Sequence, residues 1–343
     1  MKRIRVALVA GGRSSEHEIS LASARSVLAA LDPDVYDVTS VAIGRDGRWE
    51  LGRGEAPPRE LEAAAAHAAA ETLPVPADAA VPATLAEVDV VLPILHGPFG
   101  EDGTVQGLLE LAGVPYVGAG VAASAVCMDK DLCKKVLHKS GIEVAAHIAI
   151  REGDEIANPY GFPVFVKPAR LGSSIGITKA HDEDELREAV ELARRHDDKV
   201  LVEEFVGGTE VECGVLGNRR PIASVVGEIV PQAEWYDYAA KYDEGGSEII
   251  IPARVSEDVA RRVQEIAVDA FIATDCEGMA RIDFFVRDDG VVVLNEINTI
   301  PGFTDTSVYT RLFEASGIPY PELLQRLIDL ALERHERRSK LKF

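Results

Sequence analysis

The first third of the chain alternates apolar runs with an amphipathic stretch, and this alternation limits the possible folds more than any other feature. The runs RIRVALVA, VTSVAI and VDVVLPIL are typical of strands. A helix is expected between the first two, from about residue 15 to residue 31. Within it, Ala24, Val27 and Leu31 recur at the i, i+3 and i+7 positions of a buried face. Strands that alternate with helices predict a parallel sheet covered on both faces.

The sequence of the remaining two thirds of the chain predicts at least one further domain. A second organisation begins near Met128, and the last third returns to strands in ASVVGEIV, MARIDFFV and VVVLNEIN before a C-terminal helix. A length of 343 residues, at roughly 150 residues per domain, allows two or three domains. The Ala- and Pro-rich segment at 61–87 is expected to be a peripheral insertion without chemistry, because its prolines interrupt a helix.

Charge and cysteine content exclude several classes of protein. The chain carries 57 acidic against 36 basic residues, a net charge of −21, which argues against a general nucleic-acid binder but not against a locally basic phosphate site. Four cysteines without C-x-x-C spacing fit free thiols in a reducing compartment. No apolar stretch approaches the roughly 20 residues of a membrane helix. We therefore expect a cytoplasmic protein that does not bind membranes.

The segment PVFVKPARLGSSIGI has the features of a triphosphate site. Lys167 precedes Pro168 on a predicted strand, so its ammonium group extends from a strand rather than a helix. The following GSSIG contains Ser173 and Ser174, and its backbone N–H groups could cradle phosphate oxygens. The Walker pattern is absent, and a glycine-rich hairpin with a surface lysine is the alternative.

Two further segments fit a nucleotide. Lys130 lies near the start of a predicted helix, where it could reach a phosphate, although an exposed helix lysine is the common alternative. In VLVEEFVGGTEVE, the main chain of Glu204 and Val206 could bind the edge of a base. Glu210, past the glycine turn, could then bind ribose hydroxyl groups.

Acidic side chains on two predicted strands indicate a metal site. In MARIDFFV, Arg281 and Asp283 lie on one face of a strand. In VVVLNEINT, Glu296 and Asn298 share a face in the same way. Two carboxylates and an amide oxygen suit Mg²⁺, whose shell is completed by water and substrate phosphates. Arg281 could hold developing negative charge beside them, and a structural Arg–Asp ion pair is the alternative.

Two glycine-rich turns follow predicted strands. In AGGRSSEHE, Ser15 and Glu18 fit a capping box, and Glu16 lies at the edge of the sheet where ligands of α/β folds bind. The turn lacks G-x-G-x-x-G, so an enzyme that transfers hydride is disfavoured. In LHGPFGEDG, His96 follows a strand, and its position alone favours a structural and a functional role equally.

Seven motifs follow one another along nearly the whole chain: GGRSSEHEIS, LHGPFGEDG, MDK, VFVKPARLGSSIGI, WYDYAAKY, RIDFF and NEINTIPGFTDTS. In this combination and order the chain resembles the D-alanine–D-alanine ligases of the ATP-grasp superfamily. The resemblance implies an α/β and α+β fold of three lobes. It implies a Rossmann-like N-terminal substrate domain with a parallel sheet at 1–125, a central ATP-grasp lobe at 126–213 and a C-terminal lobe with metal and catalytic residues at 214–343.

The resemblance also implies a reaction. ATP and two molecules of D-alanine would give ADP, phosphate and D-alanyl-D-alanine, a peptidoglycan precursor, by way of an acyl phosphate. Two Mg²⁺ ions, replaceable by Mn²⁺, and a homodimer are implied as well. A D-alanine–D-lactate or other D-amino-acid ligase of the same superfamily is the first alternative, and a nucleotide-binding sensor without turnover is the second.

Site residues carry over at the matching positions. Those implied to bind the nucleotide are Lys130, Lys167, Ser174, Glu203, Glu204, Val206, Glu210 and Asn295, and those implied to bind metal are Asp283, Glu296 and Asn298. Those implied to be catalytic are Glu16, Ser173, Tyr242, Arg281 and Gly302, and those implied to bind substrate are Glu16, His96, Lys241 and Ser307. Among these, Glu16 would pair with the first substrate's ammonium group, and Arg281 with the N–H of Gly302 would bind the tetrahedral oxyanion. Lys241 and Tyr242 would belong to a loop that closes over the site.

Overall fold

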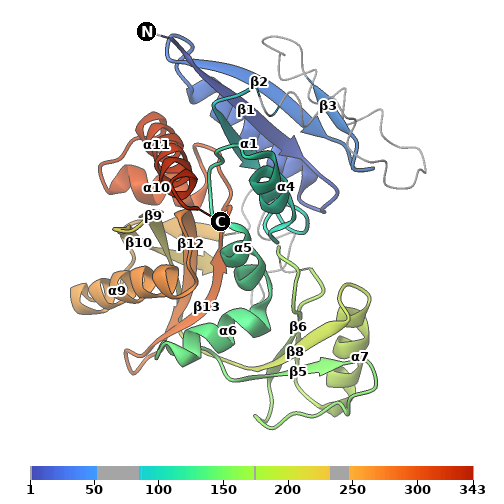
Figure 1. Cartoon of the computed structure of the whole chain (residues 1–343). Coiled ribbons are helices and arrows are strands. Elements are labelled where there is room, and N and C mark those ends of the chain that lie inside the picture. The colour runs from blue at the N-terminus through green and yellow to red at the C-terminus, as the bar shows by residue number, and fades with distance from the viewer. Residues whose placement is uncertain (1, 52–84, 86, 174, 232–246, 343) are drawn as a thin grey trace.

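Three β-sheets with their covering helices make up the residues that the structure describes, which are 2–51, 85, 87–173, 175–231 and 247–342 of this computed structural model (Figure 1). Each sheet takes its strands from one stretch of the chain, so the three sheets follow one another in sequence order. The predicted α/β and α+β fold of three lobes is confirmed.

The N-terminal sheet has the strand order β3-β2-β1-β4. β1 pairs in parallel with β2 and β4, as predicted, whereas β3 is antiparallel to β2. Only residues 44–48 separate β2 from β3, too few for the crossover that a parallel pair needs. Helices α1 and α4 cover opposite faces. The elements are β1 (Ile4–Gly11), α1 (His17–Ala30), β2 (Tyr36–Ile43), β3 (Trp49–Leu51), β4 (Val90–Ile94) and α4 (Thr104–Ala112).

The central sheet is antiparallel throughout, with the strand order β5-β8-β6-β7. Helix α7 covers one face through its apolar side, and Asp182 caps its start by accepting the N–H groups of Asp184 and Glu185. Two short helices precede the sheet. The elements are α5 (Val121–Met128), α6 (Lys130–Lys139), β5 (His147–Arg151), β6 (Val164–Pro168), β7 (Thr178–Ala180), α7 (Glu183–Arg194) and β8 (Lys199–Glu204).

The C-terminal sheet has the order β11-β10-β9-β12-β13 and is also antiparallel. Helix α9 packs on one face and α10 on the other. The predicted boundary at residue 213 falls inside β9, which pairs with β10 and β12, and the division into domains stays a prediction. The elements are β9 (Thr209–Gly217), β10 (Ile222–Pro231), β11 (Ser247–Ile250), α9 (Glu257–Ala273), β12 (Gly278–Val286), β13 (Val292–Asn298), α10 (Val308–Ala315) and α11 (Tyr320–Ser339).

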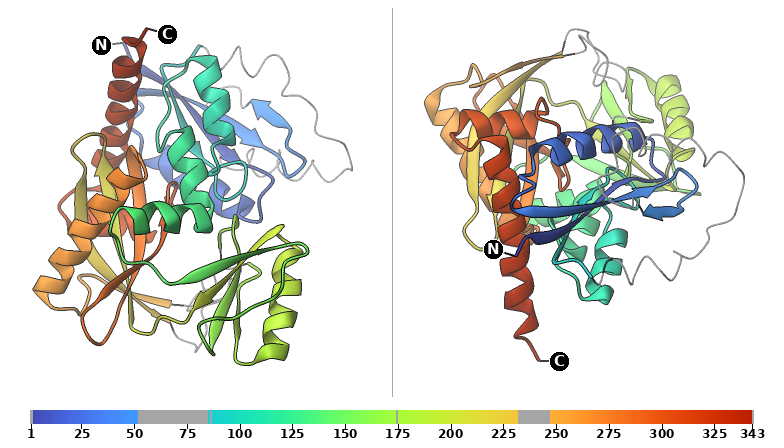
Figure 2. Two further views of the ribbon diagram at one scale, coloured as in Figure 1. Left: turned by 60° about the horizontal axis from the view of Figure 1, so that its bottom comes forward. Right: turned by 90° about the horizontal axis from the view of Figure 1, so that it is seen from above.

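The C-terminal helix α11 joins the first and last sheets. Figure 2 shows it beside the N-terminal strands, and side chains from α11, α1, β1 and β12 form one apolar cluster. Leu21, Leu327 and Met279, from three of these elements, are each no more than 1% exposed. This shared core fixes the N-terminal sheet against the C-terminal one.

Arg334 of α11 strengthens this junction, and we expect Arg334→Met to lower the free energy of unfolding by about 2–4 kcal/mol. Its guanidinium is buried, donates to the carbonyl oxygens of Tyr116 and Gly118, and lies 4.3 Å from the centre of the Tyr116 ring. Methionine would leave both carbonyl groups unpaired. Urea denaturation measures the change, with the exposed Arg338→Met on the same helix as a control expected to stay within about 1 kcal/mol. Equal losses in the two variants would contradict the expectation.

Two further predictions concern the segment 61–87 and the absence of a membrane helix. Of the segment 61–87, only Leu85 and Glu87 are described, and Leu85 is completely buried. The rest of that prediction lies outside the described residues. Among the helices that are described, none has both the length and the apolar character needed to cross a membrane.

Candidate active site

A pocket lies between the central and C-terminal sheets, at the place where the sequence predicts a nucleotide. Lysines from α6 and β6 and acidic residues from β8, β9, β12 and β13 face the same space. The pocket therefore collects side chains that are up to 166 residues apart in the chain, from 130 to 296. Its lining includes the predicted residues Lys130, Lys167, Ser173, Glu203, Glu204, Val206, Glu210, Asp283, Asn295 and Glu296.

Glu203 is held between two lysines at the bottom of the pocket. Its carboxylate lies 2.5 Å from the ammonium nitrogen of Lys167 and 3.0 Å from that of Lys134, and all three side chains are buried. Burial acts to raise the pKa of Glu203, but the two ammonium groups outweigh it and lower this pKa to about 2. Burial lowers the pKa of Lys134 from its usual value. The cluster carries one net positive charge, which suits a phosphate group.

Lys134 was not among the residues predicted from sequence. It lies one helical turn after Lys130 on α6, and its ammonium group also donates to the carbonyl oxygen of Asn295 on β13 (3.2 Å). Nothing in the run DKDLCKK separates a buried lysine from its exposed neighbours, because that difference depends on which side of α6 meets β8 and β13.

Lys130 is positioned by the start of helix α6. Asp129 caps the helix, and the buried ammonium group of Lys199 binds its carboxylate at 2.5 and 2.6 Å. The Lys130 ammonium donates to the carbonyl oxygen of Leu171 (2.7 Å) and lies 3.6 Å from Glu296. Lys130 thus joins the loop after β6 to β13, on opposite sides of the pocket.

The loop after β6 has the close approach that its small residues predict. Ser173 has a φ of +56°, in the left-handed region that few residues other than glycine adopt. A Cβ on Gly172 would lie 3.4 Å from a carboxylate oxygen of Glu16. The predicted phosphate loop and the predicted ammonium-binding carboxylate therefore lie close together, although 156 positions separate them. Ser174 lies outside the described residues.

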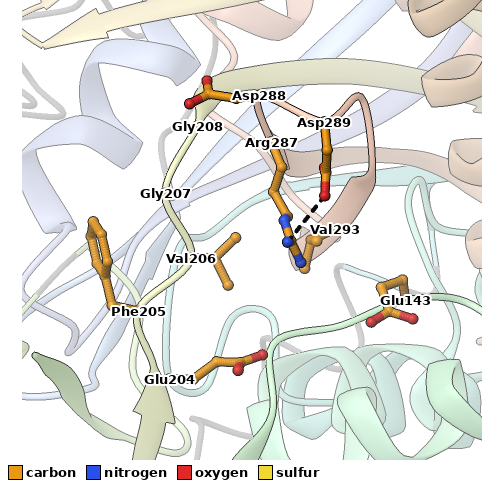
Figure 3. A pocket seen from close by; sticks show the side chains of 10 residues that line it. All are labelled: Glu143, Glu204, Phe205, Val206, Gly207, Gly208, Arg287, Asp288, Asp289 and Val293. Atoms are coloured by element: carbon orange, nitrogen blue, oxygen red, sulfur yellow. Dashed lines mark ion pairs between the residues drawn. The ribbon is translucent and has the colours of Figure 1, made fainter. Parts of the chain in front are cut away.

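A second, wider pocket lies beside the first, on the link from β8 to β9. Figure 3 shows Glu204 and Glu143 on one side of its opening and the Arg287–Asp289 ion pair (3.1 Å) on the other. Its charged lining is mainly acidic, which disfavours phosphate. The link itself, from Phe205 to Gly208, lines this pocket, and Glu204 and Val206 line both. The main chain of this link therefore borders both pockets.

The guanidinium group of Arg281 on β12 binds carboxylates on two neighbouring strands, β9 and β12. Its guanidinium lies 2.8 Å from Asp283 on its own strand and 2.8 Å from Glu212 on β9. All three side chains are at most 9% exposed. Burial acts to lower the pKa of Arg281, but these carboxylates outweigh it and raise the pKa well above its usual value. The Arg–Asp ion pair considered as an alternative is therefore formed, and Glu212 is a member that sequence reasoning missed.

The three predicted metal ligands lie together on paired strands. In the β12–β13 pairing, Asp283 is opposite Glu296 and Arg281 is opposite Asn298. The amide nitrogen of Asn298 donates to Asp283 (2.9 Å). This bond does not use the amide oxygen of Asn298, which is the atom that would bind a metal. Within the described chain, no group of three His, Cys, Asp or Glu side chains could hold a metal by itself. Two carboxylates and an amide fit an ion that shares its remaining positions with phosphates and water, as Mg²⁺ does.

The turn after β1 carries Glu16, which is buried at the start of α1. The predicted capping box is wrong: Glu16 occupies the N-cap position, and no side chain caps this helix. Instead, the hydroxyl of Ser14 accepts from the N–H of Glu16 (3.3 Å) and donates to the carbonyl oxygen of His96 (2.7 Å). Ser14 thereby joins the turns after β1 and β4.

Further along, His96 and Gly97 lie in the turn after β4, close to Glu16. A Cβ on Gly97, whose φ is +72°, would lie 2.7 Å from a carboxylate oxygen of Glu16, so only glycine fits there. His96 is buried, burial lowers its pKa, and its Nδ1 lies 2.9 Å from the carbonyl oxygen of Ile300. The structure thus places His96 in the predicted region.

The loop after β13 places Gly302 beside Ser307. A Cβ on Gly302 would lie 3.2 Å from the Ser307 hydroxyl, which accepts from the N–H of Thr304 (3.0 Å). Ser307 stands at the start of α10, where N–H groups favour an anion such as a carboxylate. Lys241 and Tyr242 of the predicted closing loop lie outside the described residues.

Two family models match the chain. The D-ala D-ala ligase N-terminus matches residues 5–119 and the D-ala D-ala ligase C-terminus matches residues 136–329. The D-alanine–D-alanine ligase of Mycobacterium sp. (strain KMS) is 50% identical and covers 97% of both chains.

Solved structures agree with this match. The VanG D-Ala:D-Ser ligase of Enterococcus faecalis superposes with a TM-score of 0.85 at 36% identity, over 96% of this chain and 100% of that one. The D-alanine–D-alanine ligase of Bacillus anthracis complexed with ATP gives a TM-score of 0.76 at 28% identity, over 98% of this chain and 100% of that one. From its folded architecture, its site and these matches, the chain belongs to the D-alanine–D-alanine ligase family.

Proposed function

We propose that this chain joins two molecules of D-alanine into D-alanyl-D-alanine while ATP is cleaved to ADP and phosphate, for peptidoglycan precursors. The observation that carries the proposal is the closeness of Glu16 to the loop at Gly172. It brings a carboxylate suited to an amino acid's ammonium group against a loop suited to a phosphate, so the carboxylate of a bound amino acid would lie near the γ-phosphate. Proximity of this kind supplies much of the rate in phosphoryl transfer.

The site residues support a two-step reaction. In the first step, a D-alanine carboxylate oxygen attacks the γ-phosphorus and the bond to ADP breaks, giving an acyl phosphate. Lys130 and Lys167 offset the negative charge on the phosphate oxygens. In the second step, the neutral amine of the second D-alanine attacks the acyl carbon, and phosphate leaves as the amine loses a proton. Arg281 and the N–H of Gly302 stabilise the oxyanion.

The remaining roles follow the family resemblance and, where the residues are described, their positions. Glu204, Val206 and Glu210 would hold the base and ribose, and Asn295 lies beside them in the pocket wall. Asp283, Glu296 and Asn298 would hold Mg²⁺, or Mn²⁺ in its place, which when bound screens the phosphate oxygens. Ser173, Ser174, Lys241 and Tyr242 are proposed for loops over the reacting groups, and Ser307 for the second substrate's carboxylate.

A ligase with a different acceptor is the second candidate, and similarity to the VanG D-Ala:D-Ser ligase favours it. One experiment separates the candidates. Purified protein is supplied with ATP, Mg²⁺ and D-alanine alone, or with D-alanine plus D-serine or D-lactate, and phosphate release and products are measured. We expect D-alanyl-D-alanine as the main product and no release after chelation by EDTA. A mixed product in preference to D-alanyl-D-alanine would support the second candidate, and ATP binding without phosphate release would support a sensor.

We also infer a cytoplasmic homodimer. The four cysteines are free and buried, which fits a reducing compartment, and the dimer rests on the family resemblance alone. Sedimentation equilibrium at micromolar concentration tests the dimer, because a mass near 36.9 kDa would correspond to one chain.

A further inference from the structure

Glu101 has none of the roles proposed above, yet it binds both the turn that carries His96 and the loop that leads to Gly302. It follows β4 and is partly buried. Its Oε2 accepts from the N–H of Gly97 (2.8 Å), and its Oε1 accepts from the N–H of Ile300 (2.9 Å), 199 positions further along the chain. The first bond closes the turn that carries His96. The second bond reaches the loop after β13 that leads to Gly302.

Ile300 is therefore held at both polar groups of its backbone. Its N–H donates to Glu101, and its carbonyl oxygen accepts from Nδ1 of His96 (2.9 Å). A carbonyl oxygen can only accept, so His96 carries its hydrogen on Nδ1 and leaves Nε2 as an acceptor. That Nε2 atom is buried and has no hydrogen-bond partner among the described residues. Glu101 thus holds the N–H of Ile300, and the carbonyl oxygen of Ile300 in turn fixes the tautomer of His96.

The constraint on Ile300 extends to Gly302. Between them lies only Pro301, which is buried and whose ring fixes its φ angle. With the Ile300 peptide held and the φ angle of Pro301 fixed, the ψ angle of Pro301 is the one backbone rotation left between Ile300 and the N–H of Gly302. We propose that Glu101 is a positioning residue for the oxyanion donor Gly302, acting through the Ile300 amide. This inference rests on the proposed function, since it assigns a supporting role in that reaction.

The chemistry of the side chain favours a carboxylate here. Both oxygens of Glu101 accept backbone N–H groups, and glutamine could accept only one of them because its other end is a donor. Burial and the negative charge of Glu16 raise the pKa of Glu101 to about 8, so the ionised form that accepts both N–H groups predominates above that pH. The positive charge of Arg281 and the two N–H bonds act in the opposite direction.

The test compares Glu101→Gln and Glu101→Asp with a matched control, Asp89→Asn. Asp89 also binds a backbone N–H, that of Arg5 (2.9 Å), but it lies just before β4, at the end of the strand opposite His96. We expect Glu101→Gln to lower kcat for D-alanyl-D-alanine formation about 100-fold, with the Kd for ATP within twofold of wild type. Aspartate, one carbon shorter, should also lower kcat because it cannot bridge both amides. The control should retain kcat.

A second readout does not depend on turnover. In ¹⁵N-labelled protein, the amide resonance of Gly302 should move in Glu101→Gln and stay in place in Asp89→Asn. An unmoved Gly302 resonance, or a kcat within threefold of wild type in a folded Glu101 variant, would overturn the proposal. If wild type made no D-alanyl-D-alanine while the Gly302 resonance still moved, the proposed function would fail, and only the structural link from Glu101 to Gly302 would stand.

Discussion

Replacing Arg281 by lysine is expected to lower kcat by about 10²–10³-fold while the protein stays folded. The guanidinium binds Asp283 through two nitrogens (2.8 Å each) and lies 2.8 Å from Glu212. Lysine keeps the charge but has one nitrogen, so it cannot bind both carboxylates and still face a developing oxyanion. Loss of one oxyanion donor typically costs 10²–10³-fold in kcat. Steady-state phosphate release with D-alanine measures the kcat of the variant and of the wild type.

Arg254→Lys is the matched control for this prediction. Arg254 also binds a buried carboxylate in a bidentate manner, that of Glu228, but its side chain is 62% exposed, and neither residue lines the nucleotide pocket. We expect this variant to keep the wild-type kcat. If Arg281→Lys retained kcat within fivefold of wild type, Arg281 would be a structural ion-pair partner and would not stabilise the transition state.

Replacing Glu203 by glutamine is expected to cost about 3–5 kcal/mol of stability and at least tenfold in ATP affinity. The carboxylate balances Lys134 and Lys167, and removing one member of a buried charge group leaves the others uncompensated. Two unneutralised ammonium groups would also repel each other and shift from the positions that face the phosphates. Urea denaturation and titration calorimetry with ATP measure the two effects. Glu228→Gln, which frees only an exposed arginine, should lower stability less and leave ATP binding unchanged.

The pKa of Glu203 adds a pH dependence to this prediction. Because its pKa falls from 4.5 in the unfolded chain to about 2 in the folded protein, its contribution is fully present above pH 5. It is lost as the pH falls from about 5 to 2, and it amounts to about 3 kcal/mol. The stability difference between wild type and Glu203→Gln should therefore shrink on acidification. A difference that did not change between pH 7 and pH 3 would contradict the assigned ion pairs.

Local sequence patterns were sufficient to predict much of the fold. The alternation of strands and helices predicts the parallel pairing of β1 with β2 and β4, because period and segment length depend on neighbouring residues alone. Along β6, the same reasoning places the side chain of Lys167 opposite to Val164 and Val166, which are buried in the core while Lys167 lines the pocket. The antiparallel strand β3 was not predicted, since its three residues carry too little pattern to show.

The predicted site residues differ in how far sequence could assign them. Arg281, Asp283, Glu296 and Asn298 come from two strands joined by a short turn, so their proximity follows once the strands are recognised. Whether the Arg281–Asp283 contact is a structural pair or part of a site did not follow, because the third member, Glu212, comes from β9. Lys241 and Tyr242, which the resemblance implies for the closing loop, lie outside the described residues.

By itself, the sequence determined the order of strands and helices, the loops rich in glycine and serine, and the family to which the motifs are similar. These properties are local, since they depend on residue spacing and on which side chains a turn permits. Only the tertiary structure decided that Lys134 is buried against Glu203, that Glu16 meets the loop at Gly172, and that Glu101 binds Ile300. Each of these pairs joins segments between 69 and 199 positions apart, and the packing of the sheets and helices, rather than any local pattern, brings them close together.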